Sequence, residues 1–262
     1  MNIGYLGFGS MGSAVAEAFA KYCGEVKDGS VVQYAYAPHQ DKLRARAAEI
    51  GAVPCASAQE LVRASDMVIL ACKPYQAEDV LSGVKDALAG KALVSLVNAW
   101  FFADFKRALG ERVRVQCIMP SIPMKIKSGV VLLAEENDLT ADERALLRRL
   151  CEASATVIEL PEEKIPAATA LCGCGPAFFY MAIEAMGDAG VKNGLQRRMA
   201  YELAAAAMVG AGSMVLADRT THPGAMKDAV CSPAGTTIRG VAALEEAGMR
   251  NAFIKAVEAT LH

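Results

Sequence analysis

The chain has 262 residues, of which 53% are hydrophobic and 21% charged, and its formal net charge at pH 7 is −2. This length allows one large domain or two modest ones, and the lack of a basic block argues against nucleic acid or an anionic membrane surface as a partner. We expect no signal peptide, because an apolar run begins directly after Met1, and no membrane span, because the longest uncharged helical stretch, Leu203 to Ala217, is shorter than the roughly 20 residues that cross a bilayer.

The N-terminal stretch predicts a buried strand, a glycine-rich turn and a helix in direct succession. The turn is Gly7-Phe8-Gly9-Ser10-Met11-Gly12, and all six residues are candidates for binding a dinucleotide. In such a unit the first glycine makes the tight turn, the second lets the backbone approach a pyrophosphate, and the third lets helix and strand pack closely. The helix N-terminus then faces the phosphates. A purely structural turn is the alternative, and the strand and helix on either side favour the cofactor site.

A second strand is predicted over residues 31–37, and the residues after it bear on the choice of cofactor. A site that prefers NAD usually places an acidic residue here to bind the ribose hydroxyls, but Pro38 and His39 follow the strand instead. His39 and the cations after it suit the 2′-phosphate of NADP, with NAD as the alternative. Lys42, Arg44 and Arg46 are equally well explained as a solvated helix face.

The next segments alternate between strand and helix up to residue 160. We predict strands over 67–71, 92–97, 113–118, 129–134 and 155–160, and helices over 42–50, 58–64, 77–88, 103–109 and 140–152, the last opened by a Thr140-x-x-Glu143 capping box. This alternation is typical of a Rossmann-type, parallel, doubly wound α/β sheet. Ala71-Cys72-Lys73-Pro74 and Asn98 follow strands at the carboxyl edge of that sheet, so we assign them to the cofactor site.

The composition changes near Pro161, which divides the chain into a dinucleotide-binding domain (1–161) and an all-helical domain (162–262) for substrate binding and dimerisation. Helices are predicted over 165–171, 176–191, 197–216, 238–246 and 250–261. The helix over 197–216 is apolar nearly all round and must be enclosed. Because the helical region is too small to enclose it within one chain, we predict a homodimer or higher homo-oligomer.

Three loops are candidates for a substrate pocket. Asn98-Ala99-Trp100 and Met119-Pro120-Ser121 lie at strand ends that face the cofactor. In the second domain, the run from Ser232 to Thr237 opens a helix, and its hydroxyl and backbone N–H groups suit a carboxylate. A plain helix cap explains this run equally well.

The eight cysteines are scattered without a Cys-x-x-Cys pair, and only Cys172 and Cys174 lie close together. With three dispersed histidines, the sequence offers no zinc site. We therefore predict no metal, reduced thiols and a cytoplasmic protein.

Several motifs together resemble the pyrroline-5-carboxylate reductase family over nearly the whole chain, most closely from Gly173 onward. They occur in the order Gly7-Phe8-Gly9-Ser10-Met11-Gly12, Ala71-Cys72-Lys73-Pro74, Gly173-Cys174-Gly175-Pro176-Ala177-Phe178, His222-Pro223-Gly224-Ala225-Met226-Lys227-Asp228 and Ser232-Pro233-Ala234-Gly235-Thr236-Thr237.

The resemblance implies a Rossmann domain followed by a helical domain that interlocks with a second subunit. It also implies hydride transfer from a reduced nicotinamide to the cyclic imine 1-pyrroline-5-carboxylate, giving L-proline in the last step of proline biosynthesis. By position, the backbone around Gly235 and Thr236 would hold the carboxylate, with Ser232 in the same loop. The Thr237 hydroxyl would lie near the ring nitrogen.

The sequence departs from the family pattern at several site positions. Cys172 and Cys174 replace serines, Ser121 replaces an asparagine, and Pro38-His39 stand in place of Asn-Arg. The usual Ala-Ala-Gly beside the nicotinamide is Val97-Asn98-Ala99, followed by the bulky Trp100-Phe101-Phe102. Two alternatives therefore stay open: a related imine or 2-keto acid reductase with another substrate, and a degenerate member that binds dinucleotide without catalysis.

Overall fold

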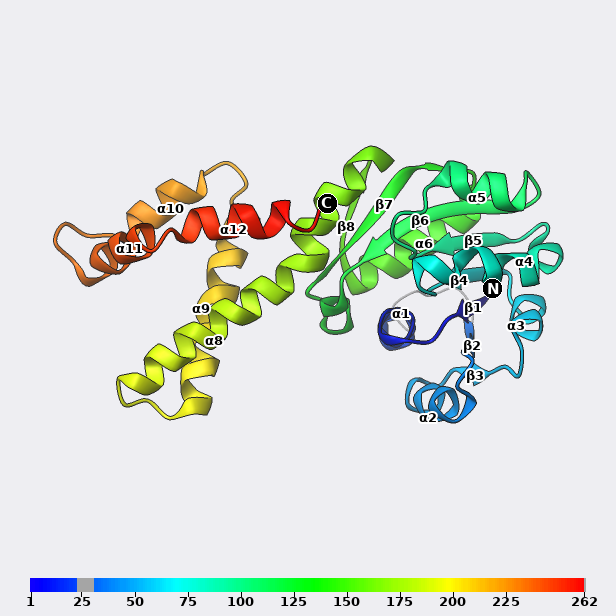
Figure 1. Cartoon of the computed structure of the whole chain (residues 1–262), viewed down its shortest axis with the longest axis horizontal. Coiled ribbons are helices and arrows are strands. Elements are labelled where there is room, and N and C mark those ends of the chain that lie inside the picture. Colours follow the sequence, from blue (N-terminus) through cyan, green and yellow to red (C-terminus); the bar gives the residue numbers. More distant parts are fainter. Residues whose placement is uncertain (23–30, 262) are drawn as a thin grey trace. The chain divides into compact units, whose positions relative to one another are not determined.

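The computed structural model describes residues 1–22 and 31–261 of the chain (Figure 1). It divides into two compact units, Met1–Gly173 and Cys174–His262. The division falls after Gly173 and not at Pro161, where the composition changes, because the turn Glu162–Lys164 (η4) and helix α7 (Ile165–Thr169) both contact strand β7 of the first unit.

Unit 1 is built on one eight-stranded sheet with the order β3-β2-β1-β4-β5-β6-β7-β8 (Figure 1). The strands are β1 (Asn2–Leu6), β2 (Val32–Tyr36), β3 (Val53–Pro54), β4 (Met67–Leu70), β5 (Ala92–Ser95), β6 (Arg114–Pro120), β7 (Gly129–Asn137) and β8 (Ala155–Leu160). Leu6 is in register with Leu70, Leu70 with Ser95, and Ser95 with Cys117. These pairs bring the ends of β1, β4 and β5 to one carboxyl edge of the sheet.

The predicted doubly wound sheet is confirmed, and β1 to β6 pair in parallel as expected, whereas the further strand β7 pairs antiparallel with β6. A parallel return requires a crossover of about a dozen residues or more, and only the 3₁₀ turn Ile122–Ile126 (η3) forms a helix between these strands. Strand β6 extends beyond its predicted end at residue 118 and includes Pro120. Pro120 is the last residue of the strand and pairs with Val131 of β7.

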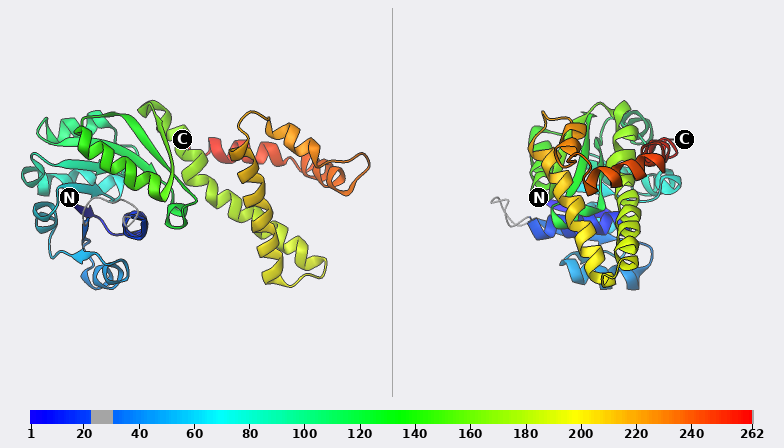
Figure 2. Two further views of the ribbon diagram at one scale, coloured as in Figure 1. Left: turned by 180° about the vertical axis from the view of Figure 1, so that it is seen from behind. Right: turned by 90° about the vertical axis from the view of Figure 1, so that its left-hand side faces the viewer.

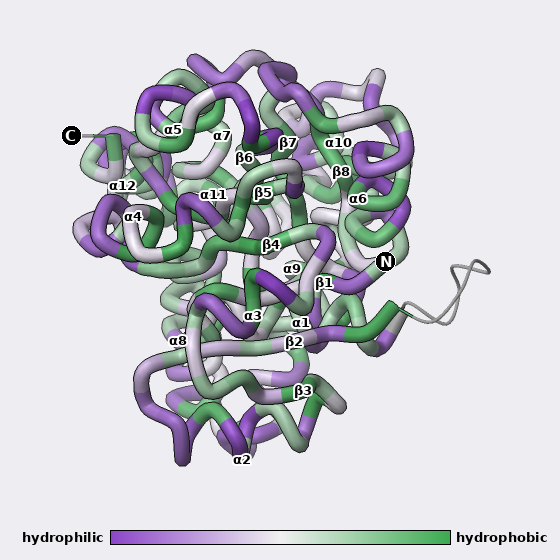
Figure 3. The backbone as a smooth tube through the Cα atoms, turned by 90° about the vertical axis from the view of Figure 1, so that its right-hand side faces the viewer, coloured by the Kyte–Doolittle hydropathy of each residue, from purple (hydrophilic) through white to green (hydrophobic). Residues whose placement is uncertain are grey.

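Helices cover both faces of the sheet, and each face has its own hydrophobic core. Helices α1 (Ser10–Tyr22), α2 (Gln40–Ile50) and α6 (Ala141–Ser154) pack on one face, and α3 (Ala58–Ala64), α4 (Ala77–Leu88) and α5 (Phe102–Leu109) on the other. Strand β4 is buried at every residue and hydrophobic along its length, whereas α2 is mostly hydrophilic (Figure 3). Burial on two faces explains why the central strands are continuous apolar runs in the sequence.

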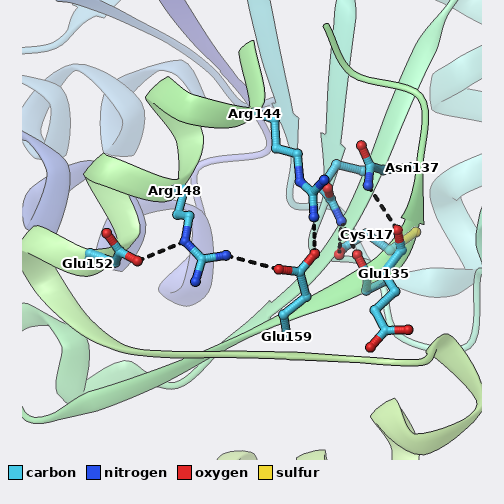
Figure 4. A network of polar contacts seen from close by, with 9 residues as sticks. Cys117, Glu135, Asn137, Arg144, Arg148, Glu152 and Glu159 are labelled. Atoms are coloured by element: carbon cyan, nitrogen blue, oxygen red, sulfur yellow. Dashed lines mark hydrogen bonds and ion pairs between the residues drawn. The ribbon is translucent and has the colours of Figure 1, made fainter. Parts of the chain in front are cut away.

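The start of α6 has the predicted capping box, and the helix is tied to the edge strand β8. The N–H of Glu143 donates to Thr140 Oγ1 at 3.3 Å, and the N–H of Thr140 donates to the Glu143 carboxylate at 2.9 Å. Arg144 and Arg148 of α6 both bind Glu159 of β8 (Figure 4). These partly exposed ion pairs add little stability singly, but they fix the helix along the edge of the sheet.

Unit 2 is entirely helical. Its helices are α8 (Gly175–Lys192), α9 (Arg197–Ala217), α10 (Pro223–Ala229), α11 (Thr236–Glu246) and α12 (Met249–Glu258), and a π-helical turn, Ala170–Cys174 (η5), leads into α8. Helices α8 and α9 form an antiparallel hairpin (Figure 2). The hairpin closes tightly, because a Cβ atom at Gly187 would lie 2.3 Å from the Tyr201 ring.

Helix α9 is largely uncovered within the chain, since only Ala200 and Ala204 are buried. Large apolar side chains stand in solvent along it, including Leu203 at 56% and Val209 at 69% exposure. By length and composition alone, Glu162–Lys192 and Arg197–Ala217 are apolar enough to cross a membrane. A helix that is covered by a second subunit has the same composition, and the surface of α9 is the kind that such an interface buries.

Candidate active site

A pocket of about 570 Å³ opens at the carboxyl edge of the sheet in unit 1. Residues that follow three strands line it: Gly7, Phe8 and Gly9 after β1, Ala37, Pro38 and His39 after β2, and Ala71, Cys72 and Lys73 after β4. The strand order places β1 between β2 and β4, so these loops meet at the point where the order of the strands in the sheet reverses. Ligands of such sheets bind at this place.

The three glycines of the first turn have three different environments. Gly7 has a φ of +105° and donates its N–H to the Tyr36 carbonyl at 3.0 Å, so it makes a turn that a side chain would strain. A Cβ at Gly12 would lie 2.2 Å from the Gly7 carbonyl oxygen, so Gly12 permits the close approach of α1 to the turn. A Cβ at Gly9 would meet no protein atom within 4 Å. The fold requires Gly7 and Gly12, whereas the space beside Gly9 is open to a ligand.

The part of the pocket after β2 is lined by the His39 imidazole and the Lys42 ammonium group. His39 lies at the N-terminus of α2 without a hydrogen bond from its side chain to that helix, and Lys42 lines the pocket from the first turn of α2. Neither Ala37 nor Pro38 offers a carboxylate to ribose hydroxyls. The groups at this end of the pocket therefore suit a phosphate on the adenosine ribose better than two free ribose hydroxyls.

The residues after β4 give the pocket a half-buried thiol and a constrained turn. Burial raises the pKa of the Cys72 thiol, which keeps it neutral. The N–H of Lys73 donates to the Gln76 side chain at 3.3 Å, and Pro74 begins the 3₁₀ turn Pro74–Gln76 (η2) that leads into α4. The walls contributed by Gln76, Val80 and Gly83 were not predicted, because no sequence pattern shows which side of α4 faces the pocket.

The remaining candidates of unit 1 do not line this pocket. Ser10, Met11 and Gly12 form the first turn of α1, and Pro74 follows Lys73 at the start of the next turn. Asn98 lines a separate, narrow cavity of about 20 Å³ after β5 and β6, together with Trp100, Cys117 and Glu162. Ala99 has a φ of +61° there, and its N–H donates to the Asn98 side chain at 3.0 Å.

The candidate carboxylate loop lies in unit 2 and opens α11. Gly235 is the N-cap residue, and its N–H donates to the Ser232 carbonyl at 3.0 Å. A Cβ at Gly235 would lie 2.4 Å from Ser232 Oγ, so a larger residue here would displace the Ser232 hydroxyl. No side chain caps α11, whereas His222 Nδ1 accepts the N–H of Gly224 in α10. The loop is thus a helix cap without a side-chain acceptor, and the N–H groups of Thr236 and Thr237 have no acceptor within the helix.

Comparisons with known proteins cover the whole chain. Residues 162–262 match the family model described as pyrroline-5-carboxylate reductase dimerisation, and residues 2–99 match that described as NADP oxidoreductase coenzyme F420-dependent. A pyrroline-5-carboxylate reductase of Treponema pallidum is 40% identical over 265 residues, which covers 100% of this chain and 99% of that protein. One from Escherichia coli is 35% identical, with 97% and 94% covered.

Solved structures agree with these matches. The crystal structure of Plasmodium falciparum pyrroline carboxylate reductase with NADP bound has a TM-score of 0.88 to this chain, at 27% identity, and the match covers 100% of this chain and 95% of that one. A Streptococcus pyogenes 1-pyrroline-5-carboxylate reductase has a TM-score of 0.86 at 26% identity, with 100% and 96% covered.

Proposed function

The chain belongs to the pyrroline-5-carboxylate reductase family, and we propose that it reduces 1-pyrroline-5-carboxylate to L-proline with hydride from NADPH, the last step of proline biosynthesis. It is an oxidoreductase that acts on a CH–NH bond and uses NADP. The full-length match at 40% identity to a reductase of that name carries the proposal.

The pocket of unit 1 fits the cofactor at the three places that a dinucleotide needs. The open space at Gly9 would let a pyrophosphate approach the backbone there, at the N-terminus of α1. His39 and Lys42 receive the adenosine 2′-phosphate. Cys72 and Lys73 would lie beside the bound dinucleotide, and Asn98, which follows β5, would lie toward its nicotinamide end.

NADPH supplies the hydride when it is bound, so the protein has little acid–base work to do. The imine nitrogen is basic enough to take its proton from solvent, and the electron pair of the C=N bond moves to that nitrogen as the hydride reaches carbon. The backbone N–H groups at Thr236 and Thr237, with the Ser232 hydroxyl beside Gly235, hold the substrate carboxylate. The Thr237 hydroxyl hydrogen-bonds the ring nitrogen. These contacts orient the imine toward the hydride donor more than they activate it chemically.

The protein works as a homodimer or a larger homo-oligomer in the cytoplasm. The apolar face of α9 and the match of residues 162–262 to a dimerisation model support this assembly. Light scattering should find no stable, folded monomer at micromolar concentration. A monodisperse monomer that retains its far-UV circular dichroism would contradict the assembly.

Substitutions near the cofactor make substrate choice the point to test. Asn98, Trp100, Ser121, Cys172 and Cys174 differ from the family pattern, so a related imine or 2-keto acid is the second candidate substrate class. An assay of NADPH oxidation against a panel of cyclic imines and 2-keto acids decides between them. We expect 1-pyrroline-5-carboxylate to give the highest kcat/KM, with a modest preference for NADPH over NADH, and a higher value with another substrate would overturn the assignment.

A further inference from the structure

The segment that follows β5, residues 98–101, is held in a constrained conformation. Ala99 adopts a left-handed backbone with a φ of +61°, which residues with a Cβ rarely adopt. Such conformations persist where surrounding contacts impose them, and they cluster at functional sites. The Asn98 side chain accepts the N–H of Ala99 at 3.0 Å, but this contact is internal to the segment.

Two contacts fix the segment from outside. Glu162 Oε1 accepts the N–H of Phe102 at 2.7 Å across 60 positions of sequence. The Cys117 thiol, in the middle of β6, contacts the Trp100 carbonyl oxygen at 3.9 Å. The N–H of Phe102 is one of the first-turn donors of α5 that have no partner within the helix. Glu162 therefore acts as a distant cap for α5 and as an anchor for the residues just before it.

Glu162 is itself held in a fixed position. It begins the 3₁₀ turn η4, and its own N–H donates to the Glu136 carboxylate of β7 at 2.9 Å. Burial raises the pKa of Glu162, and the nearby carboxylates of Glu136 and Asp104 act in the same direction, while the Phe102 N–H and the Cys117 thiol lower it. A partly buried carboxylate in this setting is costly unless its hydrogen bonds form, so its contact with Phe102 restrains both partners.

The sheet register places this segment beside the cofactor pocket. Leu70 of β4 is in register with Ser95 of β5, so the residues after β5 start one strand spacing, about 4.8 Å, from Ala71. A dinucleotide with its pyrophosphate at Gly9 and its adenosine ribose after β2 extends in the opposite direction, over the ends of β4 and β5. Residues 98–101 therefore lie where the nicotinamide end arrives.

We propose that Glu162 is a positioning residue that, by accepting the Phe102 N–H, holds residues 98–101 against the nicotinamide end of the cofactor. The inference rests on the proposed function, because it assumes that a reduced nicotinamide occupies this edge of the sheet. Loss of the anchor leaves the pyrophosphate and adenosine contacts in place. It should therefore affect the alignment of the cofactor with the imine more than the affinity for NADPH.

Trp100 makes the segment directly observable, because it is the only tryptophan of the chain. Its intrinsic fluorescence and its quenching by acrylamide report on residues 98–101 in the protein without any ligand. In Glu162→Ala we expect more acrylamide quenching of Trp100 and a roughly tenfold fall in kcat/KM, the lower end of the effect of losing a hydrogen bond to a charged acceptor. The fall should come mainly from kcat, with a smaller rise in the dissociation constant of NADPH.

Three matched variants separate positioning from a general loss of structure. Glu162→Gln keeps an acceptor oxygen, so its Trp100 quenching and its kcat/KM should both be close to those of wild type. Glu163→Ala removes the neighbouring carboxylate, which is 73% exposed and pairs with solvent-exposed Lys164, and should behave like wild type. Phe102→Pro deletes the N–H donor, whereas Phe102→Ala removes the same ring and keeps the donor. Proline suits this first helical position, and the extended conformation of Phe101 before it is compatible with proline.

The proposal is supported if Phe102→Pro reproduces the quenching and the kcat loss of Glu162→Ala, and Phe102→Ala does not. Equal Trp100 quenching in Glu162→Ala and wild type would overturn the proposal. Equal Trp100 quenching in the two Phe102 variants would also overturn it. The comparison of the Phe102 variants tests the proposal even if Glu162→Ala does not fold. Trp100 quenching is measured without substrate. A wild-type protein that does not reduce the imine would therefore refute the proposed function. The Trp100 quenching would still show whether Glu162 holds residues 98–101 in place.

Discussion

Replacing Gly9 and, separately, Gly12 with alanine divides the requirements of the cofactor from those of the fold. The two glycines lie in the same turn, three positions apart, yet their surroundings differ. An added Cβ at Gly9 meets no protein atom within 4 Å, whereas at Gly12 it would lie 2.2 Å from the Gly7 carbonyl oxygen. The same chemical change should therefore affect NADPH binding in one variant and stability in the other.

The expected size of each effect follows from these contacts. Gly9 is the N-cap residue of α1, and its carbonyl accepts the N–H of Ser13 at 2.9 Å. Alanine is a poorer N-cap by up to about 1 kcal/mol, and it lowers the entropy of the unfolded chain by an amount worth about 0.4–1 kcal/mol. These terms nearly cancel, so the Tm of Gly9→Ala should stay close to that of wild type. Overpacking in Gly12→Ala should cost about 1–3 kcal/mol, or several degrees in Tm.

The affinity for NADPH should show the opposite order. A methyl group at Gly9 occupies the space assigned to the pyrophosphate and displaces it from backbone N–H groups. A hydrogen bond to a charged group contributes about 1.5–3 kcal/mol, which corresponds to a roughly 10- to 150-fold rise in Kd. Titration calorimetry with NADPH and thermal unfolding of the free protein measure the two quantities. Wild-type affinity in a folded Gly9→Ala variant would refute the placement of the pyrophosphate.

Three further changes test other parts of the molecule. Thr237→Val should lower kcat/KM by roughly 10- to 150-fold and leave NADPH affinity and Tm nearly unchanged; a lower Tm with intact turnover would make Thr237 a structural residue only. The Arg114 guanidinium lowers the pKa of Glu143 below its ordinary 4.5, so the stabilisation from this pair is present above that pH and lost as the pH falls through the folded-state pKa. Glu143→Gln should therefore lower the free energy of unfolding by about 1.5–3 kcal/mol at neutral pH and by progressively less in acid, and a pH-independent difference in urea unfolding would contradict this. Gly187→Ala places a Cβ 2.3 Å from the Tyr201 ring and should cost about 1–3 kcal/mol, so an unchanged Tm would show that the α8–α9 hairpin closes less tightly.

Much of unit 1 could be predicted from residue patterns, because its central strands are buried on both faces. The apolar runs at Met67–Leu70 and Ala92–Ser95, both buried at every residue, and the capping box at Thr140 each mark an element within a residue or two of its observed bounds. Residue patterns do not show whether a strand pairs parallel or antiparallel with its neighbour. The antiparallel return of β7 depends on the length of the connection after Pro120, and strand β3, at Val53–Pro54, is too short to show a period.

The helical region shows the same division. Long helices such as Arg197–Ala217 can be predicted from their composition. Helix α10, at Pro223–Ala229, is too short to show a helical periodicity in the sequence. Its two signals, a capping His222 and a proline at the first helical position, were visible in the sequence and could have been used.

The candidate site was predictable where it depends on local backbone geometry and not where it depends on distant contacts. The spacing of Gly7, Gly9 and Gly12 fixes the turn, and the structure gives each glycine a distinct environment. The role of Glu162 could not be foreseen, because its hydrogen bond to Phe102 joins residues 60 positions apart. The left-handed conformation of Ala99 was equally invisible, since alanine gives no sign of it.

Hydride transfer to 1-pyrroline-5-carboxylate is tested most directly by isotope labelling. Wild-type protein is given the imine together with NADPH that carries deuterium on the transferable position, and the product is analysed by mass spectrometry. We expect L-proline with one deuterium on the ring carbon that was doubly bonded to nitrogen, formed in step with NADPH oxidation. Proline without the label, or NADPH binding with no proline formed, would contradict it.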